Sequence, residues 1–212
     1  MEKLLNPEVS GQIKEYLTPM KNNITLVLFT EGECQTCHET RQLLSEVSEL
    51  STKITVIEKD LSSPEAKEYA ITLTPSFVIL NDKGVYQGVK FNGIPAGHEI
   101  NSFLSALMDM SGHDFGFDDS IKARLDKLTR KVNIKVFVTL SCPHCPPAVS
   151  NAHRLAMSHP MIEGEMIEAQ TFPEISNQFN VSGVPKIVID GTRELVGNQP
   201  IEAFLKEIEA LA

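Results

Sequence analysis

The sequence predicts an α/β fold made of two tandem halves, each a mixed four-stranded sheet flanked by helices. Three observations support this prediction. Two C-x-x-C motifs, at Cys34/Cys37 and Cys142/Cys145, lie 108 residues apart, about half of the 212-residue chain. A similar order of apolar strands and amphipathic helices surrounds each motif. A proline stands at nearly the same distance after the first cysteine of each motif, 41 residues in one case and 43 in the other.

The first half opens with a predicted helix over about 7–17, which Asn6 caps and Pro7 begins. The run at 24–29 is apolar and rich in β-branched residues, which is typical of a buried strand. A helix follows Cys34, with apolar residues at helical spacing. The later elements are a strand at 54–57, a short helix at 64–70, a strand at 77–80, a turn at 81–84, a strand at 85–91 and a helix from about 96.

The second half repeats this order after a Gly- and Asp-containing stretch at 111–117. Its predicted elements are a helix from about 119, a strand at 134–138, a long helix after Cys142, a strand near 166–169, a short helix from 173, a strand at 187–189, a turn at 190–191, a strand at 194–196 and a helix at 200–211. The stretches 70–75 and 180–185 also occupy matching places. We therefore expect two domains, 1–115 and 116–212, rather than one large domain.

Composition excludes several classes of function. The chain has 19 Lys and Arg against 28 Asp and Glu, a net charge of −9 without a basic stripe, which argues against binding to nucleic acid. No apolar run approaches the roughly 18 residues that span a bilayer, and the polar start lacks the apolar core of a signal peptide. We therefore expect a cytoplasmic protein, in which cysteine pairs serve catalysis, redox sensing or metal binding.

Each C-x-x-C motif is expected at the junction between a strand and a helix. The first cysteine then lies at the helix N-terminus, where unpaired N–H groups and the helix dipole stabilise a thiolate. The second cysteine lies one turn further on, within reach to close a disulfide. Cys34 and Cys142 are therefore the predicted nucleophiles, and Cys37 and Cys145 are predicted to resolve the mixed disulfide.

The residues around the two motifs predict different redox behaviour. His144, inside the second motif, can carry a positive charge that stabilises the Cys142 thiolate. The first motif has no such charge, and Glu31 and Glu33 precede it. We expect the C-terminal site to be the more oxidising one, since a more stable reduced form makes a stronger oxidant. The two glutamates contribute to this difference only if solvent does not screen them.

Four further residues are predicted to shape the sites. Pro75 and Pro185 stand at strand entrances, where a residue without an N–H group is tolerated, and their matching positions favour a special role over ordinary turns. Glu58 and Glu168 occupy matching strand ends. They are either buried carboxylates that take protons from the resolving thiols or exposed acids without such a role.

Metal and haem sites are not expected. The stretch 34–38 matches the C-x-x-C-H pattern of haem attachment, but no export signal precedes it and it opens a helix. Structural zinc sites usually place their cysteine pairs ~15–20 residues apart, far closer than the two pairs here. We therefore predict no bound metal and no bound cofactor.

These features together resemble the protein disulfide oxidoreductases of thermophilic archaea and bacteria, which are glutaredoxin-like proteins with a double thioredoxin fold. The resemblance covers nearly the whole chain and rests on both motifs and on the stretches 91–99, 137–146 and 184–189. It implies two tandem thioredoxin-like domains, with Pro75 and Pro185 in cis peptide bonds beside the cysteines. It also implies reduction, formation and isomerisation of protein disulfides in the cytosol, with electrons from an NADPH-dependent, thioredoxin-reductase-like flavoprotein.

The sequence departs from the family and from thioredoxin at defined positions. Thr36 and His144 stand where family members often have Tyr, which leaves the two redox potentials open. The positions of thioredoxin's Trp and buried Asp are occupied here, in the two halves, by Glu33 and Leu28, and by Ser141 and Val136. The proton relay of thioredoxin therefore does not transfer to this chain.

Two other functions stay open at this point. One is an electron shuttle between a flavoprotein reductase and a peroxidase, similar to the N-terminal part of the alkyl hydroperoxide reductase flavoprotein. That part keeps one C-x-x-C motif, so the two intact motifs here favour the oxidoreductase. The other is a redox sensor or chaperone-like binding protein, which changes its disulfides without turnover on protein substrates.

Overall fold

The computed structural model describes residues 3–32 and 34–211. The first half contains, in chain order, α1 (Pro7–Leu17), β1 (Ile24–Thr30), α2 (Gln35–Ser48), β2 (Ile54–Asp60), α3 (Pro64–Glu68), β3 (Ser76–Leu80), β4 (Tyr86–Asn92), the 3-10 helix η1 (Gly97–Glu99) and α4 (Ile100–Met110). The second half contains α5 (Asp119–Leu125), β5 (Val132–Val138), α6 (Cys145–Ser158), β6 (Ile162–Glu168), α7 (Pro173–Gln178), β7 (Lys186–Ile189), β8 (Arg193–Val196) and α8 (Ile201–Glu209). The predicted α/β fold of two tandem halves is confirmed.

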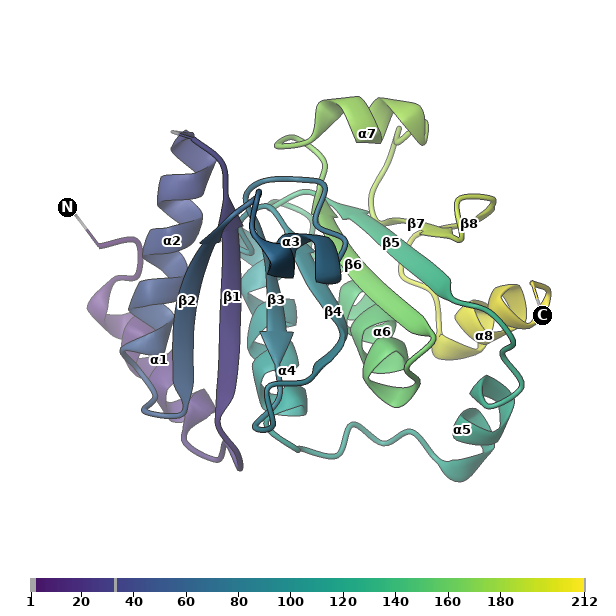
Figure 1. Cartoon of the computed structure of the whole chain (residues 1–212), viewed down its shortest axis with the longest axis horizontal. Coiled ribbons are helices and arrows are strands. Elements are labelled where there is room, and N and C mark those ends of the chain that lie inside the picture. Colours follow the sequence, from purple (N-terminus) through teal and green to yellow (C-terminus); the bar gives the residue numbers. More distant parts are fainter. Residues whose placement is uncertain (1–2, 33, 212) are drawn as a thin grey trace.

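Within the described residues, the strands form one eight-stranded sheet in the order β2-β1-β3-β4-β6-β5-β7-β8 (Figure 1). In the first half, β1 pairs in parallel with β2 and antiparallel with β3; in the second, β5 pairs in the same way with β6 and β7. The halves meet where β4 and β6 pair in parallel. Each half thus has the predicted mixed four-stranded sheet, and the two sheets are joined edge to edge.

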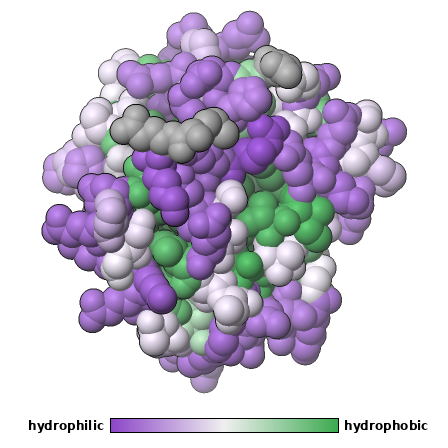
Figure 2. All heavy atoms as spheres, turned by 90° about the vertical axis from the view of Figure 1, so that its left-hand side faces the viewer, coloured by the Kyte–Doolittle hydropathy of each residue, from purple (hydrophilic) through white to green (hydrophobic). Residues whose placement is uncertain are grey.

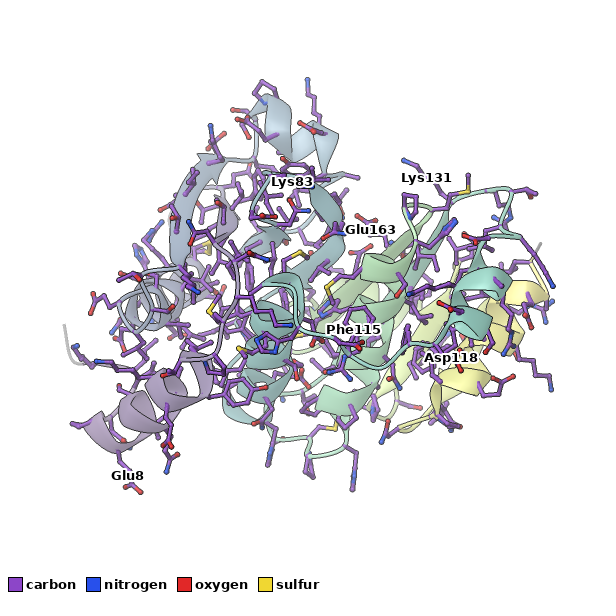
Figure 3. All side chains as sticks on the ribbon, turned by 90° about the horizontal axis from the view of Figure 1, so that it is seen from below. Glu8, Lys83, Phe115, Asp118, Lys131 and Glu163 are labelled. Carbon is purple, nitrogen blue, oxygen red and sulfur yellow. A yellow bond between two sulfur atoms is a disulfide. The ribbon has the colours of Figure 1, made fainter. Side chains whose placement is uncertain are left out.

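Strand β6 begins at Ile162, about four residues before its predicted start. Its first part carries the charged residues Glu163 and Glu165, which are not typical of a buried strand. The strand forms because β4 and β5 flank it on both sides and supply lysines. Lys90 lies 2.9 Å from Glu163, and Lys135 lies 3.0 Å from Glu165. Paired and hydrogen-bonded charges are tolerated in such a place, and Figure 3 shows Glu163 at the boundary between the halves.

The two faces of the sheet are covered differently. One face carries α1, α2, α4, α6 and α8 over a single apolar core that draws on both halves. The other face carries α3 and α7, each over a smaller apolar cluster of its own. Alternation along the strands divides the side chains, so that Leu28 faces the large core and Phe29 the cluster under α3.

The segment from α4 to α5 connects the halves, and Figure 3 shows Phe115 and Asp118 on it. Arg154 of α6 lies over the ring of Phe115, 5.9 Å from the ring centroid, and forms an ion pair with Asp109 at 2.7 Å. The side chain of Asp118 accepts hydrogen bonds from two backbone N–H groups of α5 and so caps that helix. The connection is thus attached to both halves.

Candidate active site

The two C-x-x-C motifs lie at the same edge of the sheet, the one formed by the C-terminal ends of β1 and β5. Strands β1 and β5 run in the same direction, because two antiparallel and two parallel pairings lie between them. The loops that follow these strands therefore leave one edge, and α2 and α6 then pack on one face, in the same apolar core. Four strand spacings of about 4.8 Å separate β1 from β5, so the two motifs are about 20 Å apart.

At the first site, Cys34 and Cys37 form a disulfide. Cys34 is the N-cap of α2, as predicted, and its Sγ accepts a hydrogen bond from the backbone N–H of Cys37 at 3.0 Å. Cys34 is partly exposed, whereas Cys37 is buried at 1 % exposure. A sulfur in this position is open to attack and, once reduced, is stabilised as a thiolate by the helix N-terminus.

At the second site, Cys142 and Cys145 form a disulfide, but the helix begins later than predicted. His144 is the N-cap of α6 and Cys145 is its first residue, so Cys142 lies in the turn before the helix. The expectation that Cys142 sits at the helix N-terminus is therefore wrong by about one turn. The reason lies in Pro146 and Pro147, which lack N–H groups and fit only the first turn of a helix.

Pro75 and Pro185 are both in cis peptide bonds, after Thr74 and Val184. Each proline directly precedes a strand, β3 or β7, whose first residue pairs with the second-to-last residue of β1 or β5. Each cis bond is thereby placed beside the strand end that leads to a C-x-x-C motif. At the second site the contact is direct, because the carbonyl oxygen of Val184 lies 3.8 Å from Sγ of Cys142.

Glu58 and Glu168 do lie at matching strand ends, but Glu58 is not buried. Its side chain is 37 % exposed, so of the two alternatives the buried carboxylate is wrong for Glu58 and the exposed acid holds. Arg41 donates two hydrogen bonds to it, at 2.7 Å from Nε and 2.6 Å from Nη2, and the Thr30 hydroxyl donates a third at 2.8 Å. The hydrogen bonds from Arg41 hold the pKa of Glu58 below its usual value. A carboxylate so stabilised is a weak proton acceptor.

Glu168, by contrast, is buried at 2 % exposure. Its carboxylate accepts hydrogen bonds from the N–H of Gln170 at 3.2 Å and from the N–H and hydroxyl of Thr171, each at 2.6 Å. These bonds hold the loop that follows β6. Among the described residues, no hydrogen bond joins Glu58 or Glu168 to a cysteine.

A third carboxylate, Glu99, was not singled out from the sequence. It is fully buried at the end of η1, which contacts α6, the helix that begins with Cys145. The Ser102 hydroxyl donates to one carboxylate oxygen, and the other has no hydrogen-bond partner among the described residues. Burial raises the pKa of Glu99 to about 7. One feature of the sequence indicates a buried position: Glu99 stands four residues before Phe103, on the side of helix α4 that packs into the core.

Each site has a different neighbouring group that stabilises the thiolate of its first cysteine. His144 is exposed beside Cys142, and Glu31 is exposed before the first motif, whereas Glu33 lies outside the described residues. The hydrogen bond from Cys37 N–H to Cys34 favours a thiolate at the first site, and Pro143 has no N–H to offer Cys142. This contact opposes the effect expected from His144, so the order of the two potentials stays a prediction.

The described part of the chain holds neither a metal-binding group nor a membrane span. Among residues 3–32 and 34–211, no cluster of three or more His, Cys, Asp and Glu side chains is placed to hold a metal ion. None of the helices in this part is long and apolar enough to cross a membrane.

Comparison with known proteins finds the same repeat. The family model for the thioredoxin domain matches residues 23–105 and again residues 132–210. Over 209 residues the chain is 30% identical to the F subunit of alkyl hydroperoxide reductase of Staphylococcus aureus, a match that covers 99% of this chain and 38% of that protein. The corresponding protein of Staphylococcus epidermidis is also 30% identical, over 205 residues. The chain thus spans 38% of the length of these curated relatives.

Two solved structures share the whole architecture. The F subunit of alkylhydroperoxide reductase of Enterococcus faecalis is 29% identical with a TM-score of 0.90, over 97% of this chain and 100% of that one. A protein disulfide oxidoreductase of Aeropyrum pernix is 28% identical with a TM-score of 0.88, over 99% and 95% of the two chains. With a disulfide at each C-x-x-C motif and the domain present twice, the chain belongs to the thioredoxin-domain family and is a double thioredoxin-fold oxidoreductase.

Proposed function

We propose that this protein reduces, forms or isomerises disulfides of protein substrates through Cys34/Cys37 and Cys142/Cys145. One observation carries the proposal: both disulfides lie at the same edge and on the same face of the sheet, each beside a cis-proline. In each pair the first cysteine is more accessible than the second: Cys34 is partly exposed and Cys37 is 1 % exposed, whereas Cys142 is 8 % exposed and Cys145 fully buried.

The chemistry is thiol–disulfide exchange. In reduction, the thiolate of the first cysteine attacks one sulfur of a client disulfide, and the other client sulfur leaves as a thiolate and takes up a proton. The second cysteine then loses its proton and attacks the mixed disulfide, which releases the remaining client thiol and closes the C-x-x-C disulfide. Counted from the dithiol, whose first cysteine has released its proton to solvent, the C-x-x-C pair loses two electrons and two protons and the client gains them. Formation of a client disulfide runs in reverse, and in isomerisation a client thiol displaces the first cysteine.

Each site needs a group that takes the proton of its second cysteine. For Cys145 we assign this part to Glu99, since it is buried in η1, which contacts α6, has one carboxylate oxygen without a hydrogen-bond partner among the described residues, and has a pKa of about 7 that suits proton exchange near neutral pH. Glu168, buried but already engaged in three hydrogen bonds, is the weaker choice. At the first site, Glu58 is a weak choice for the proton of Cys37, because its ion pair with Arg41 stabilises the charged form.

The proposed electron source is an NADPH-dependent flavoprotein of the thioredoxin reductase type, and the proposed compartment is the cytosol. The similarity to the F subunit of alkyl hydroperoxide reductase supports an exchange of electrons with such a module. The proposed boundary between the domains, at 115/116, lies on the segment between α4 and α5.

The test is insulin reduction driven by dithiothreitol, measured for the wild type, Cys34→Ser, Cys142→Ser and the double variant. We expect turnover in the wild type and none above the dithiothreitol blank in the double variant. The single variants then assign the reaction to one site or to both. A wild-type rate equal to that of the dithiothreitol blank would contradict the proposal.

A second function, an electron shuttle between a flavoprotein reductase and a peroxidase, is favoured by the 30% identity with the alkyl hydroperoxide reductase relatives over nearly the whole chain. The two functions differ in their preferred electron acceptor. A coupled assay with NADPH, a thioredoxin-reductase-type flavoprotein and this protein is run with either insulin or a disulfide-form peroxidase as acceptor. Faster NADPH consumption with insulin supports the general oxidoreductase, and activity with the peroxidase alone supports the shuttle.

A further inference from the structure

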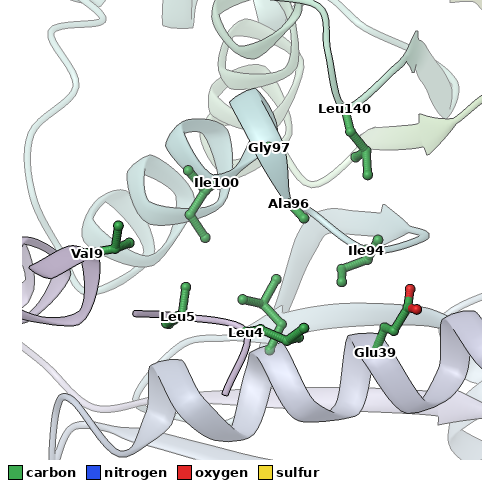
Figure 4. Close-up of a pocket in the computed structure, with 10 residues that line it drawn as sticks. Leu4, Leu5, Val9, Glu39, Ile94, Ala96, Gly97, Ile100 and Leu140 are labelled. Carbon is green, nitrogen blue, oxygen red and sulfur yellow. The ribbon is translucent and has the colours of Figure 1, made fainter. Parts of the chain in front are cut away.

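We propose that an apolar groove between the two C-x-x-C sites binds an extended, apolar and non-acidic segment of the client polypeptide. The choice of a polypeptide client rests on the proposed function. The groove has a volume of about 350 Å³ (Figure 4). Its principal lining residues are Leu4, Leu5, Leu43, Ile94, Ile100 and Leu140.

The walls of the groove belong to the two redox sites. One wall is α2, the helix that Cys34 caps, and it contributes Leu43 and Glu39. The opposite wall includes Leu140, two residues before Cys142 in the loop between β5 and α6. The loop after β4 closes the groove between them (Figure 4). The lining thus comes within two residues of each motif along the chain, at Glu39 and at Leu140, so the remainder of a bound polypeptide can extend toward either motif.

The lining determines what kind of ligand fits. Figure 4 shows aliphatic side chains, among them Leu4, Ile94 and Leu140, turned toward a common space, with the carboxylate of Glu39 at one end. Glu39 is the single charged side chain among these lining residues. A small polar ligand would find few anchoring groups here, whereas apolar side chains of a polypeptide would be taken out of water. The Glu39 carboxylate and the net charge of −9 disfavour acidic segments.

Hydrogen bonds to the rest of the chain hold both walls of the groove in place. The N–H groups of Leu4 and Leu5 donate to the two carboxylate oxygens of Glu46 on α2, at 3.0 and 2.9 Å, which fixes the N-terminal segment as a wall. On the other side, His98 N–H donates to the carbonyl oxygen of Leu140 at 2.9 Å. Walls that need no ordering lower the entropic cost of binding.

The groove also opens to the surface. Leu4 is 46 % exposed although it is apolar. Figure 2 shows apolar side chains at the surface of the face that carries α1 and α2, surrounded by polar ones. Apolar surface of this kind, rimmed by polar residues, is typical of binding sites.

A cysteine-free peptide tests binding apart from redox chemistry. The probe is a short peptide of Leu, Phe and Lys with one Trp; because this protein has no Trp, the emission on excitation of that Trp reports the peptide alone. We expect binding to the wild type, and affinity at least about tenfold weaker for Leu4→Glu, which places a charge in the groove. Leu4 is exposed, so this change does not endanger the fold. The matched control is Val196→Glu, at 65 % exposure on β8, which should bind as the wild type does.

Three results would overturn the groove: no binding by the wild type, equal binding by Leu4→Glu, or equal loss in Val196→Glu. The same peptide with Glu in place of Lys should bind several-fold more weakly; equal or tighter binding would overturn the assigned charge preference. In insulin reduction, Leu4→Glu should raise KM and leave kcat unchanged, with no effect on hydroxyethyl disulfide, which has no side chains to bind. Peptide binding without any turnover of insulin would support the groove and contradict the proposed oxidoreductase function. Turnover of insulin without peptide binding would contradict the groove and support the oxidoreductase function.

Discussion

The backbone carbonyl of Leu140 accepts a hydrogen bond from the N–H of His98 at 2.9 Å. This bond ties the segment after β4, in the first half of the chain, to the loop that carries Cys142 in the second. Gly97 approaches the same carbonyl so closely that an added Cβ would lie 2.3 Å from its oxygen. The second redox site is therefore built in part by the first half.

Replacing Gly97 with alanine should damage this contact. Gly97 has φ +57°, which disfavours a side chain, and the new Cβ would collide with backbone rather than with a flexible group. We expect a loss of about 2–3 kcal/mol in the free energy of unfolding, measured in urea, and slower insulin reduction by Cys142 in a Cys34→Ser background. Gly84→Ala is the matched control: its φ is +71°, but nothing lies within 4 Å of the added Cβ, so it should cost about 1 kcal/mol. Equal losses would show that the contact with Leu140 contributes nothing.

Glu99→Gln should change how stability depends on pH. The pKa of Glu99 is raised from 4.5 to about 7, so between these values the folded state keeps a proton that the unfolded state has released. Stability is therefore lost as the pH rises through this window, and the glutamine variant should not show this loss. At pH 8 the variant should be more stable than the wild type, by at most about 3 kcal/mol at 1.36 kcal/mol per pH unit.

The control for Glu99 is Glu58→Gln, for which the sign is opposite. The pKa of Glu58 is lowered, mainly by Arg41, so its stabilising effect is present above the pKa of the unfolded state and is lost as the pH falls. Unfolding curves in urea from about pH 3 to pH 8 measure both variants, since the Glu58 contribution is lost only below pH 4.5. A Glu99→Gln profile parallel to that of the wild type would contradict the assignment. If Glu99 also takes the proton of Cys145, the variant should lose the rise in rate of insulin reduction near neutral pH in a Cys34→Ser background.

Lys90→Met should be strongly destabilising. Lys90 is 2 % exposed, and its Nζ lies 2.9 Å from Glu163 and donates to the carbonyl of Ala70 at 3.2 Å. Its removal leaves Glu163 without its cationic partner, while the Tyr86 hydroxyl at 2.6 Å and the Asn133 amide at 3.0 Å still donate to that carboxylate. Because Glu163 is also 26 % exposed, the loss should lie toward the lower end of the about 3–5 kcal/mol that a broken buried pair costs. The control is Lys59→Met, whose partly exposed pair with Glu65, at 2.8 Å, should contribute below about 1 kcal/mol. Similar urea midpoints for the two variants would mean that the junction does not depend on this ion pair.

His144→Gln tests the predicted difference between the two sites. Without the imidazolium charge the Cys142 thiolate is less stable, so the potential of this pair should fall by about 10–30 mV, on a scale where about 30 mV is tenfold in the equilibrium constant. Equilibration with glutathione buffers measures both pairs. Unchanged potentials in the variant would remove His144 as the cause, and a first site more oxidising than the second would show that the N–H of Cys37 dominates.

Local patterns in the sequence were sufficient for most of the fold and for the cysteines. Runs of β-branched residues, amphipathic spacing and the repeat itself located most helices and strands, because these signals depend on near neighbours along the chain. The start of β6 was missed for the same reason. In the sequence, Glu163 and Glu165 are typical of a loop. In the structure, Lys90 and Lys135 on the neighbouring strands pair with them, and only the pairing of strands brings those lysines there.

The candidate site likewise combines features that the sequence defines with features that only the tertiary structure defines. By itself the sequence determined the two C-x-x-C motifs and the prolines at 75 and 185, since each is defined by residue type and spacing. The tertiary structure decided that both motifs share one edge and one face, that Glu58 is ion-paired in solvent while Glu99 is buried with a raised pKa, and that Leu4 and Leu140 line one groove. Burial and charge pairing depend on which distant segments meet, and that is fixed by the pairing of β4 with β6 and by the packing of one core across both halves.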